Sequence, residues 1–124
     1  MRINKPDWTK KLTEYFWKNA QPLEALLIID NAGNILDHKV SLNIKKNYNA
    51  EWLKKIANKV SIRFKIVDYT KELGGLAMTI NVFHGKVMLV RTLSQKHTLV
   101  LLIPRENNLS QTINTVSDFV NESE

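Results

Sequence analysis

The pattern of hydrophobic and polar positions predicts a helix, two strands, a second helix, three strands and a final helix. The first helix begins near the potential N-cap Asp7 and ends near Ala20, because Pro22 lacks the amide hydrogen that a continuing helix needs. Its apolar residues recur at helical spacing and form one stripe, which consists of Trp8, Leu12, Tyr15 and Phe16.

The two strands that follow form a predicted hairpin. Residues 25–29 are wholly apolar, and the glycine and asparagines of 31–34 suit a tight turn because both tolerate positive φ. Residues 35–40 alternate instead, and this alternation is typical of a strand at the edge of a sheet. It places Leu36, His38 and Val40 on one face and Ile35, Asp37 and Lys39 on the other.

The second helix is predicted to run from an N-cap at Asn49 roughly to Tyr69. Its core stripe consists of Leu53, Ile56, Ala57, Val60, Phe64 and Val67. Gly74 and Gly75 end this region, and three strands follow at 78–83, 87–93 and 98–103. A last helix begins near Leu109, after a cap at Asn107 or Asn108.

The strands that begin at Ala25 and Leu99 determine the expected fold, since both are apolar on two faces. Such strands must be covered on both sides, so we expect them to be central neighbours, with the alternating strands from Ile35 and Met78 at the edges. Hairpin connections then give the strand order second, first, fifth, fourth, third. The predicted fold class is α/β (α+β): a five-stranded, mostly antiparallel sheet with the second helix on one face and the first and third helices on the other. The expected layout is similar to the three-layer sandwiches of the profilin and longin folds.

Composition narrows the class of protein. A length of 124 residues suits one domain spanning 1–124, and 44% hydrophobic residues is ordinary for a globular chain. The absence of cysteine excludes disulfides, thiol catalysis and cysteine-ligated metal centres. No apolar run is long enough for a membrane span and no export signal begins the chain, so we expect a cytoplasmic protein.

Positive charge is concentrated in one segment. The chain carries 18 lysine and arginine residues against 12 aspartate and glutamate residues, a net charge of +6. From Lys39 to Lys65, eight basic residues stand against Glu51 alone, so this segment carries +7 and the rest of the chain −1. A localised basic surface favours an acidic partner. The alternative is a solvated helix face that only keeps the protein soluble.

These features resemble the Roadblock domain family, which includes dynein light chains, endosomal scaffold subunits and bacterial gliding regulators. The resemblance covers about Trp8 to Val120. It rests on the element order, on the hairpin sequence ALLIIDNAGNIL at 25–36 and on the later run LVRTL at 89–93. It departs from the family in the basic loop 42–49, which the family often fills with small or acidic residues.

The resemblance implies a non-catalytic homodimer or heterodimer with a second Roadblock chain, which binds or regulates a Ras-like small GTPase or acts as a scaffold. In this family the middle helix and the third strand commonly build the dimer by joining two sheets edge to edge. In this chain the third strand has no proline and no charge, so its free edge would invite pairing. The candidate residues at this edge are Thr79, Asn81 and Phe83. A short edge exposed to water is the alternative.

The second helix carries further candidate interface residues beside its core stripe. They are Trp52, Lys55, Lys59, Ile62, Arg63 and Ile66. A helix face in water needs no tryptophan and no pair of isoleucines, and tryptophan and arginine are enriched at protein interfaces. We expect the basic residues to attract the partner and the three apolar residues to supply contact area. The alternative is that Trp52 folds over the rim of the sheet and the isoleucines lie under a loop.

No catalytic, cofactor or metal site is expected. The three histidines, His38, His84 and His97, fall on an edge strand and in two turns, with no acid or serine at ligand or triad spacing. No glycine-rich phosphate-binding motif occurs, because Gly74 and Gly75 precede a strand and not a helix.

Two other functions remain as alternatives to a GTPase regulator. A nucleic-acid-binding module would use the lysines together with Tyr48 and Trp52 as stacking surfaces. The exposed strands, however, lack the aromatic residues of an RNA-recognition sheet, so we expect no nucleic-acid partner. A longin-like trafficking adaptor or a scaffold docked on anionic lipid would use the same basic surface.

Overall fold

The order of helices and strands is the one that the hydrophobic pattern predicts. The computed structural model describes residues 5–41, 48–66, 78–94, 96–104 and 109–123. The elements are α1 (Lys5–Asn19), β1 (Ala25–Ile29), β2 (Ile35–Val40), α2 (Ala50–Ile66), β3 (Met78–Val82), β4 (Lys86–Ser94), β5 (His97–Pro104) and α3 (Leu109–Ser123). None of the helices in these ranges is long and apolar enough to cross a membrane.

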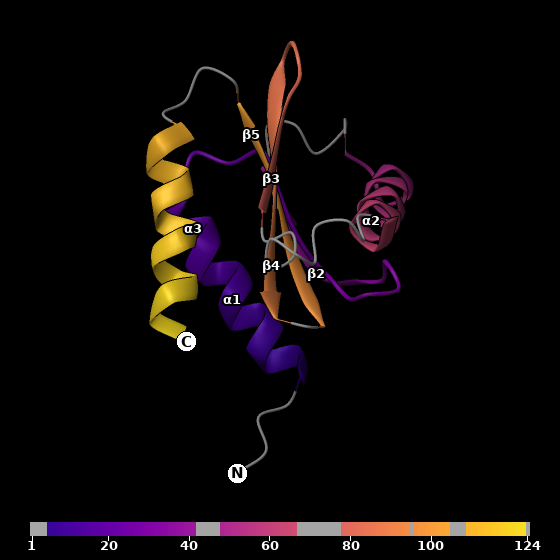
Figure 1. Cartoon of the computed structure of the whole chain (residues 1–124), viewed down its shortest axis with the longest axis horizontal. Helices are drawn as coiled ribbons and strands as arrows, with labels where there is room; N and C mark the ends of the chain where they lie inside the picture. The colour runs from indigo at the N-terminus through magenta and orange to yellow at the C-terminus, as the bar shows by residue number, and fades with distance from the viewer. Residues whose placement is uncertain (1–4, 42–47, 67–77, 95, 105–108, 124) are drawn as a thin grey trace.

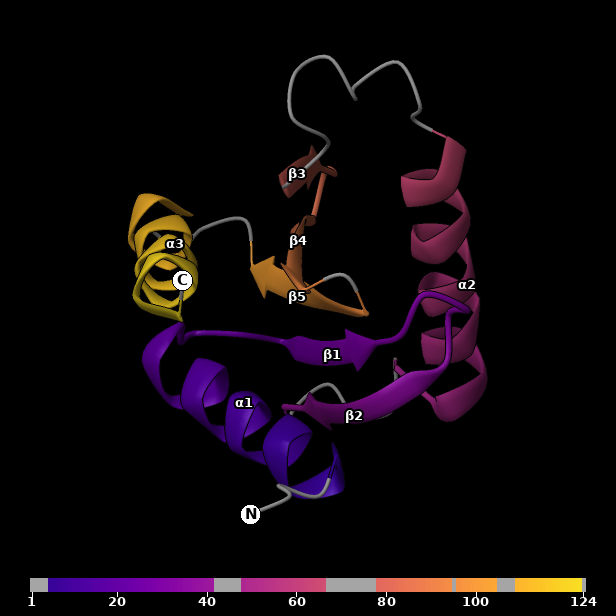
Figure 2. The same ribbon diagram turned by 60° about the horizontal axis from the view of Figure 1, so that its bottom comes forward.

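The strands form a single antiparallel sheet between two helical layers. Its order is β2-β1-β5-β4-β3, and every neighbouring pair is antiparallel. In Figure 1 the sheet is seen from its edge, with α1 and α3 on one side and α2 on the other. Figure 2 shows the strands stacked from β2 to β3, with α2 running alongside the stack. The predicted strand order and the predicted distribution of the helices are confirmed.

Two hydrophobic cores lie on opposite faces of the sheet. The α1/α3-side core includes Leu12, Phe16, Leu26, Ile28, Leu89, Leu99, Leu101 and Val116. The α2-side core includes Ala25, Leu27, Ile29, Tyr48, Leu53, Ala57, Val60, Val90, Val100 and Leu102. Successive residues of β1 and β5 enter the two cores in turn. This burial on both faces is the reason that these two strands are central.

The edge strand β2 departs from the predicted regular alternation. Ile29 pairs with Ile35 whereas Ile28 pairs with Asp37, so β2 contains one extra residue at this point. Because this bulge reverses the side to which the following residues point, Ile35 packs against the α2-side core together with Val40. The expectation that Ile35 shares a face with Asp37 and Lys39 is therefore wrong.

The helix boundaries confirm one predicted cap and correct another. The Asn49 side chain accepts a hydrogen bond from the Trp52 amide at 2.9 Å, so Asn49 caps α2 as predicted. Because α1 begins at Lys5, Asp7 lies inside the helix, so the expectation that it is the N-cap is wrong. The predicted end of the second helix at Tyr69, the glycines 74–75 and the caps at 107–108 lie outside the described residues.

The turn between β1 and β2 holds α2 against the sheet. Gly33 adopts a φ of 84°, and the Ser61 hydroxyl of α2 donates a hydrogen bond to the Asn31 carbonyl at 2.7 Å. The turn therefore contacts α2 at a defined point along its length.

The same turn lowers the pKa of Asp30. Burial opposes the ionisation of Asp30, but hydrogen bonds from Asn34, Ala32 and Gly33 outweigh this effect.

Candidate protein interface

The two edge strands of the sheet differ in charge and exposure. β2 carries Asp37, His38 and Lys39, and such side chains discourage pairing with another strand. β3 carries no charged residue, although Ile80 is 39% exposed and Val82 is 60% exposed. Phe83, directly after β3, is 55% exposed. By composition, β3 is therefore the edge that favours a partner strand.

The register between β3 and β4 determines where the predicted edge residues lie. Thr79 pairs with Val90 and Asn81 pairs with Met88. Since Val90 and Met88 pack in or against the α2-side core, Thr79 and Asn81 lie on the α2 face of the sheet. Both are half-buried. Ile80 lies on the opposite face and is still exposed there.

A pocket opens between α2 and the hairpin of β3 and β4. It has a volume of about 530 Å³. Its apolar lining comes from Trp52, Ile56, Val60, Phe83, Met88 and Leu102. Gly85, Lys59 and Lys86 complete the lining, so the two lysines supply the charge among the described residues around it. The pocket brings together Trp52, Lys59 and Phe83, which the sequence assigned to an interface on separate grounds.

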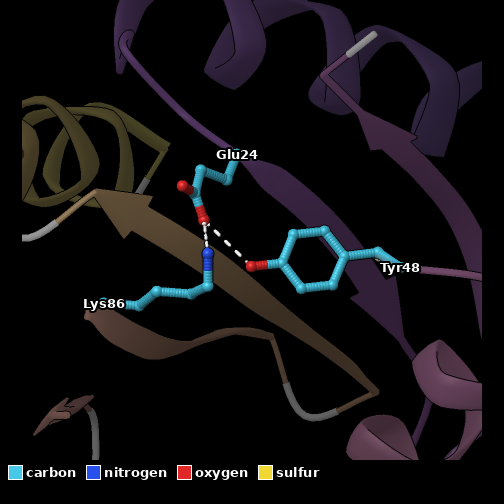
Figure 3. A network of polar contacts seen from close by, with 3 residues as sticks. All are labelled: Glu24, Tyr48 and Lys86. Carbon is cyan, nitrogen blue, oxygen red and sulfur yellow. Dashed lines mark hydrogen bonds and ion pairs between the residues drawn. The ribbon is translucent and has the colours of Figure 1, made fainter. Parts of the chain in front are cut away.

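A polar network lies beside this pocket, shown in Figure 3. The Tyr48 hydroxyl donates a hydrogen bond to Oε2 of Glu24 at 2.9 Å, and the Lys86 ammonium forms an ion pair with the same oxygen. The Lys86 ammonium also lies 5.1 Å from the centre of the Tyr48 ring. Glu24 directly precedes β1, Tyr48 precedes α2 and Lys86 begins β4. The network therefore ties the α2 layer to the sheet.

Trp52 packs against the core and also lines the pocket. Its ring lies 4.6 Å from the Tyr48 ring, centre to centre, and it packs against the α2-side core, as the rim interpretation expected. It is half-buried and lines the pocket, and its role in an interface stays a prediction. Tyr48 is only 5% exposed, so its ring cannot serve as a stacking surface for a nucleic-acid base.

The remaining predicted interface residues share α2, but not all of their side chains are described. Lys55 and Lys59 are exposed. Ile62, Arg63 and Ile66 belong to α2 by their backbone, and their side chains lie outside the described residues. Their role in an interface stays a prediction.

The predicted basic segment does not form one face. Lys39 lies on the α1 side of the sheet, with its ammonium 5.5 Å from the Trp17 ring centre, whereas Lys55 and Lys59 lie on α2. The reason is that β2 and α2 lie in different layers of the sandwich. Lys45 and Lys46 lie outside the described residues. The part of the basic surface that the structure describes beside the pocket is therefore the flank of α2.

The histidines are as scattered as the sequence indicates. His38 is in β2, His84 follows β3, and His97 begins β5 with its ring 4.6 Å from the Trp8 ring centre. Within the described ranges, no group of three or more histidine, aspartate and glutamate residues could hold a metal ion.

Within the network, the pKa values of Tyr48 and Lys86 are both raised. Burial raises the pKa of Tyr48, with its hydrogen bond to Glu24 adding to the effect and Lys86 opposing it. Burial disfavours the charged form of Lys86, but the hydrogen bonds to Glu24 and Tyr48 outweigh it and raise the pKa of Lys86. Both groups therefore hold their protons more tightly in the folded protein than in the unfolded chain.

Alkaline pH should consequently weaken the fold through this network. A raised folded-state pKa stabilises the protein below the unfolded value of about 10, and this contribution is lost as the pH rises through the folded value. We expect Tyr48→Phe to lower stability by about 0.5–1.5 kcal/mol at neutral pH and to flatten the loss above about pH 9. Urea unfolding of both proteins across this range measures the difference. Parallel pH profiles would contradict the assigned role of Tyr48.

Solved structures of Roadblock-type proteins share this fold. The gliding protein MglB of Thermus thermophilus aligns with a TM-score of 0.79 at 17% identity, over 97% of this chain and 88% of its own. MglB of Myxococcus xanthus aligns with a TM-score of 0.76 at 11% identity, over 98% of this chain and 89% of its own. A Roadblock/LC7 domain from Streptomyces avermitilis aligns with a TM-score of 0.69 at 10% identity, over 89% of this chain and 92% of its own. No protein-family model and no curated protein sequence matches the chain.

The chain therefore has the Roadblock/LC7 fold. This finding confirms the fold expected from the apolar central strands and from the family resemblance. At identities of 10–17% the likeness is one of architecture.

Proposed function

We propose that the chain is a non-catalytic, dimer-forming member of the Roadblock family that regulates or scaffolds a Ras-like small GTPase in the cytoplasm. It would do so as a single domain and without a cofactor. The support comes from the fold shared with the MglB gliding proteins and from a candidate interface that combines an uncharged sheet edge with a basic helix flank.

The observation that carries the dimer is the β3 edge. Pairing of β3 with β3 of a second copy, or of a sister chain, would extend the sheet and cover the apolar side chains of Ile80 and Val82. Thr79, Asn81 and Phe83 would lie at this junction on the α2 face. One MglB structure with a TM-score of 0.79 has a tetrameric arrangement, which supports assembly among proteins of this fold.

The basic flank of α2 supports an acidic protein partner. Lys55, Lys59 and Arg63 would attract the GTPase, and Trp52, Ile62 and Ile66 would supply apolar contact. Since exposed charges attract over a distance that salt shortens, the association rate should fall as the ionic strength rises.

The dimer is tested by placing a charge on the β3 edge in one variant and on the β2 edge in a control variant. We expect the wild-type protein to have the mass of a dimer and Ile80→Lys to have the mass of a monomer, because two lysines would face each other across the paired strands. Leu36→Lys on β2 is the matched control, since Leu36 is 40% exposed and Ile80 is 39% exposed. Light scattering after size exclusion measures the masses.

A monomeric wild-type protein would refute the dimer, and loss of assembly in both variants would show that β3 is not the specific edge. Circular dichroism of each variant confirms that the fold is retained.

A further inference from the structure

The last helix, α3, lacks most of the local features that stabilise a helix. More than half of its 15 residues are serine, threonine, asparagine or aspartate, whose side chains compete for backbone hydrogen bonds and lower helix propensity. It has no acidic residue in its first turn and no basic residue in its last turn, so no charge there complements the helix dipole. In contrast, α1 carries Lys18 in its last turn and α2 carries Glu51 in its first turn. Of the three helices, α3 therefore has the least intrinsic support.

The packing of α3 compensates for this only in part. Among its described side chains, which are those of residues 110–118, Val116 is the one buried apolar residue, with 0% of its surface exposed. Ile113 is half-buried, and the other buried side chain is the polar Thr112. The described part of α3 is therefore held against the sheet by few apolar side chains.

The hydroxyl of Thr115 adds little to the attachment of α3. It donates a hydrogen bond of 3.0 Å to the Gln111 carbonyl, one turn earlier in the same helix. A side-chain bond of this kind competes with the backbone ladder and slightly destabilises a helix. The same hydroxyl lies 3.4 Å from the Asn19 carbonyl after the last turn of α1, which is beyond the usual length of a hydrogen bond. This link between the two helices is therefore weak.

The sheet beneath α3 does not depend on this helix for its strand pairing. β5 pairs with β1 on one side and with β4 on the other. Figure 2 shows α1 alongside β1 and β2, and α3 on the side of β4 and β5. On this face of the sheet, Leu89, Leu99 and Leu101 are each 0% exposed. Departure of α3 would uncover apolar surface here without breaking a strand pair.

We propose that α3 is a lid that opens as a unit while the sheet, α1 and α2 stay folded. Opening uncovers the apolar side chains of β4 and β5 that face away from α2. Because this surface lies on the face of the sheet opposite to α2, the inference goes beyond the proposed function and does not depend on it. The chain then has a closed and an open state, and a binding event on this face can select between them.

The test is residue-resolved hydrogen exchange of the whole chain by NMR, since the exchange of an amide reports the free energy of the opening that exposes it. Relative to their rates in an unfolded chain, the amides of residues 113–118 in α3 should exchange at least about 30-fold faster than those of residues 99–102 in β5. Low concentrations of urea should change the exchange of α3 little, because a local opening exposes little surface.

Two kinds of variant separate the opening of α3 from unfolding of the whole chain. Asn114 is exposed, so Asn114→Ala and Asn114→Gly differ in helix propensity without altering the core, and α3 should exchange about fivefold more slowly in the alanine variant. Gly33→Ala strains the contact between the β1–β2 turn and α2, which is present whether α3 is closed or open. It should speed the exchange of β5 at least about tenfold and leave that of α3 within about twofold of wild type.

Three results would overturn the lid. Equal protection of α3 and β5 would show that α3 opens only with the whole chain, and so would a Gly33→Ala variant that speeds exchange in α3 as much as in β5. Equal exchange in the two Asn114 variants would show that the helix need not unfold for exchange. Faster exchange in α3 that responds to Asn114 and not to Gly33 supports the lid.

Discussion

Replacing Phe16 by alanine is expected to lower the free energy of unfolding by about 3–5 kcal/mol. Phe16 of α1 enters the α1/α3-side core with 0% of its surface exposed. Its removal leaves a cavity that the surrounding strands can fill only partly, because residues of β1, β4 and β5 are held in register by the sheet. The expected loss is a large fraction of the about 5–15 kcal/mol by which domains are usually stable.

The control for this prediction is the preceding residue. Tyr15 is 37% exposed and only edges against Phe16, so Tyr15→Ala should cost clearly less, about 1–1.5 kcal/mol. Urea unfolding followed by circular dichroism measures both values. Similar losses in the two variants would show that α1 is rotated relative to the sheet and would contradict the described core.

The comparison of Tyr15 with Phe16 shows what helical periodicity can predict. Both residues belong to the apolar stripe of the first helix, and the stripe correctly indicates the buried side of α1. Periodicity cannot tell the centre of a stripe from its margin, because this depends on where the neighbouring layer ends. The sheet and α3 cover Phe16 and leave the ring of Tyr15 at the surface, in edge contact with Phe16.

The strand order was predictable for a similar reason. β1 and β5 are apolar at successive positions, and only a central strand under two helical layers can bury such a run. The bulge that turns Ile35 to the α2 face was not predictable, because no residue of β2 has a side chain that requires one. Bulges depend on how two strands pair, and pairing is not encoded in one strand alone.

The candidate interface was predictable only in part. The uncharged third strand and the tryptophan on the second helix were visible as patterns along single elements. The network of Glu24, Tyr48 and Lys86 was not, because these residues are far apart in sequence and meet only through the strand order. The pocket was missed for the same reason: the hairpin residues that complete it approach α2 only in the folded chain.

Gly33, in the turn between β1 and β2, meets two separate requirements for glycine. The sequence indicated Gly33 as a turn residue with positive φ, and its φ of 84° confirms this. The structure adds that the same residue touches α2. A Cβ at Gly33 would lie 2.9 Å from Oδ1 of Asn58, 3.3 Å from the Asn58 Cα and 3.3 Å from the Ser61 Cβ. Glycine is therefore required both by the backbone conformation and by the close approach of a helix.

Gly33→Ala is accordingly expected to lower the free energy of unfolding by about 2–5 kcal/mol. A left-handed backbone costs a residue with a Cβ about 1–2 kcal/mol, and inserting a methyl group into a packed contact costs about 1–3 kcal/mol. The Asn58 side chain can rotate away, but the Cα of Asn58 belongs to the helix and can yield only if α2 moves from the turn. Such a movement would also lengthen the hydrogen bond from Ser61 to Asn31.

The matched control for this effect is Gly85→Ala, at the turn between β3 and β4. Gly85 does not have a positive φ, and a Cβ there meets no atom within 4 Å, so its replacement should change stability by about 0.5 kcal/mol or less. Chemical denaturation of both variants compares the two glycines. Equal small losses would mean that α2 is not held at Gly33, whereas a loss at Gly33→Ala beyond the about 1–2 kcal/mol of the left-handed backbone alone shows that the hairpin turn positions the helix whose flank lines the pocket.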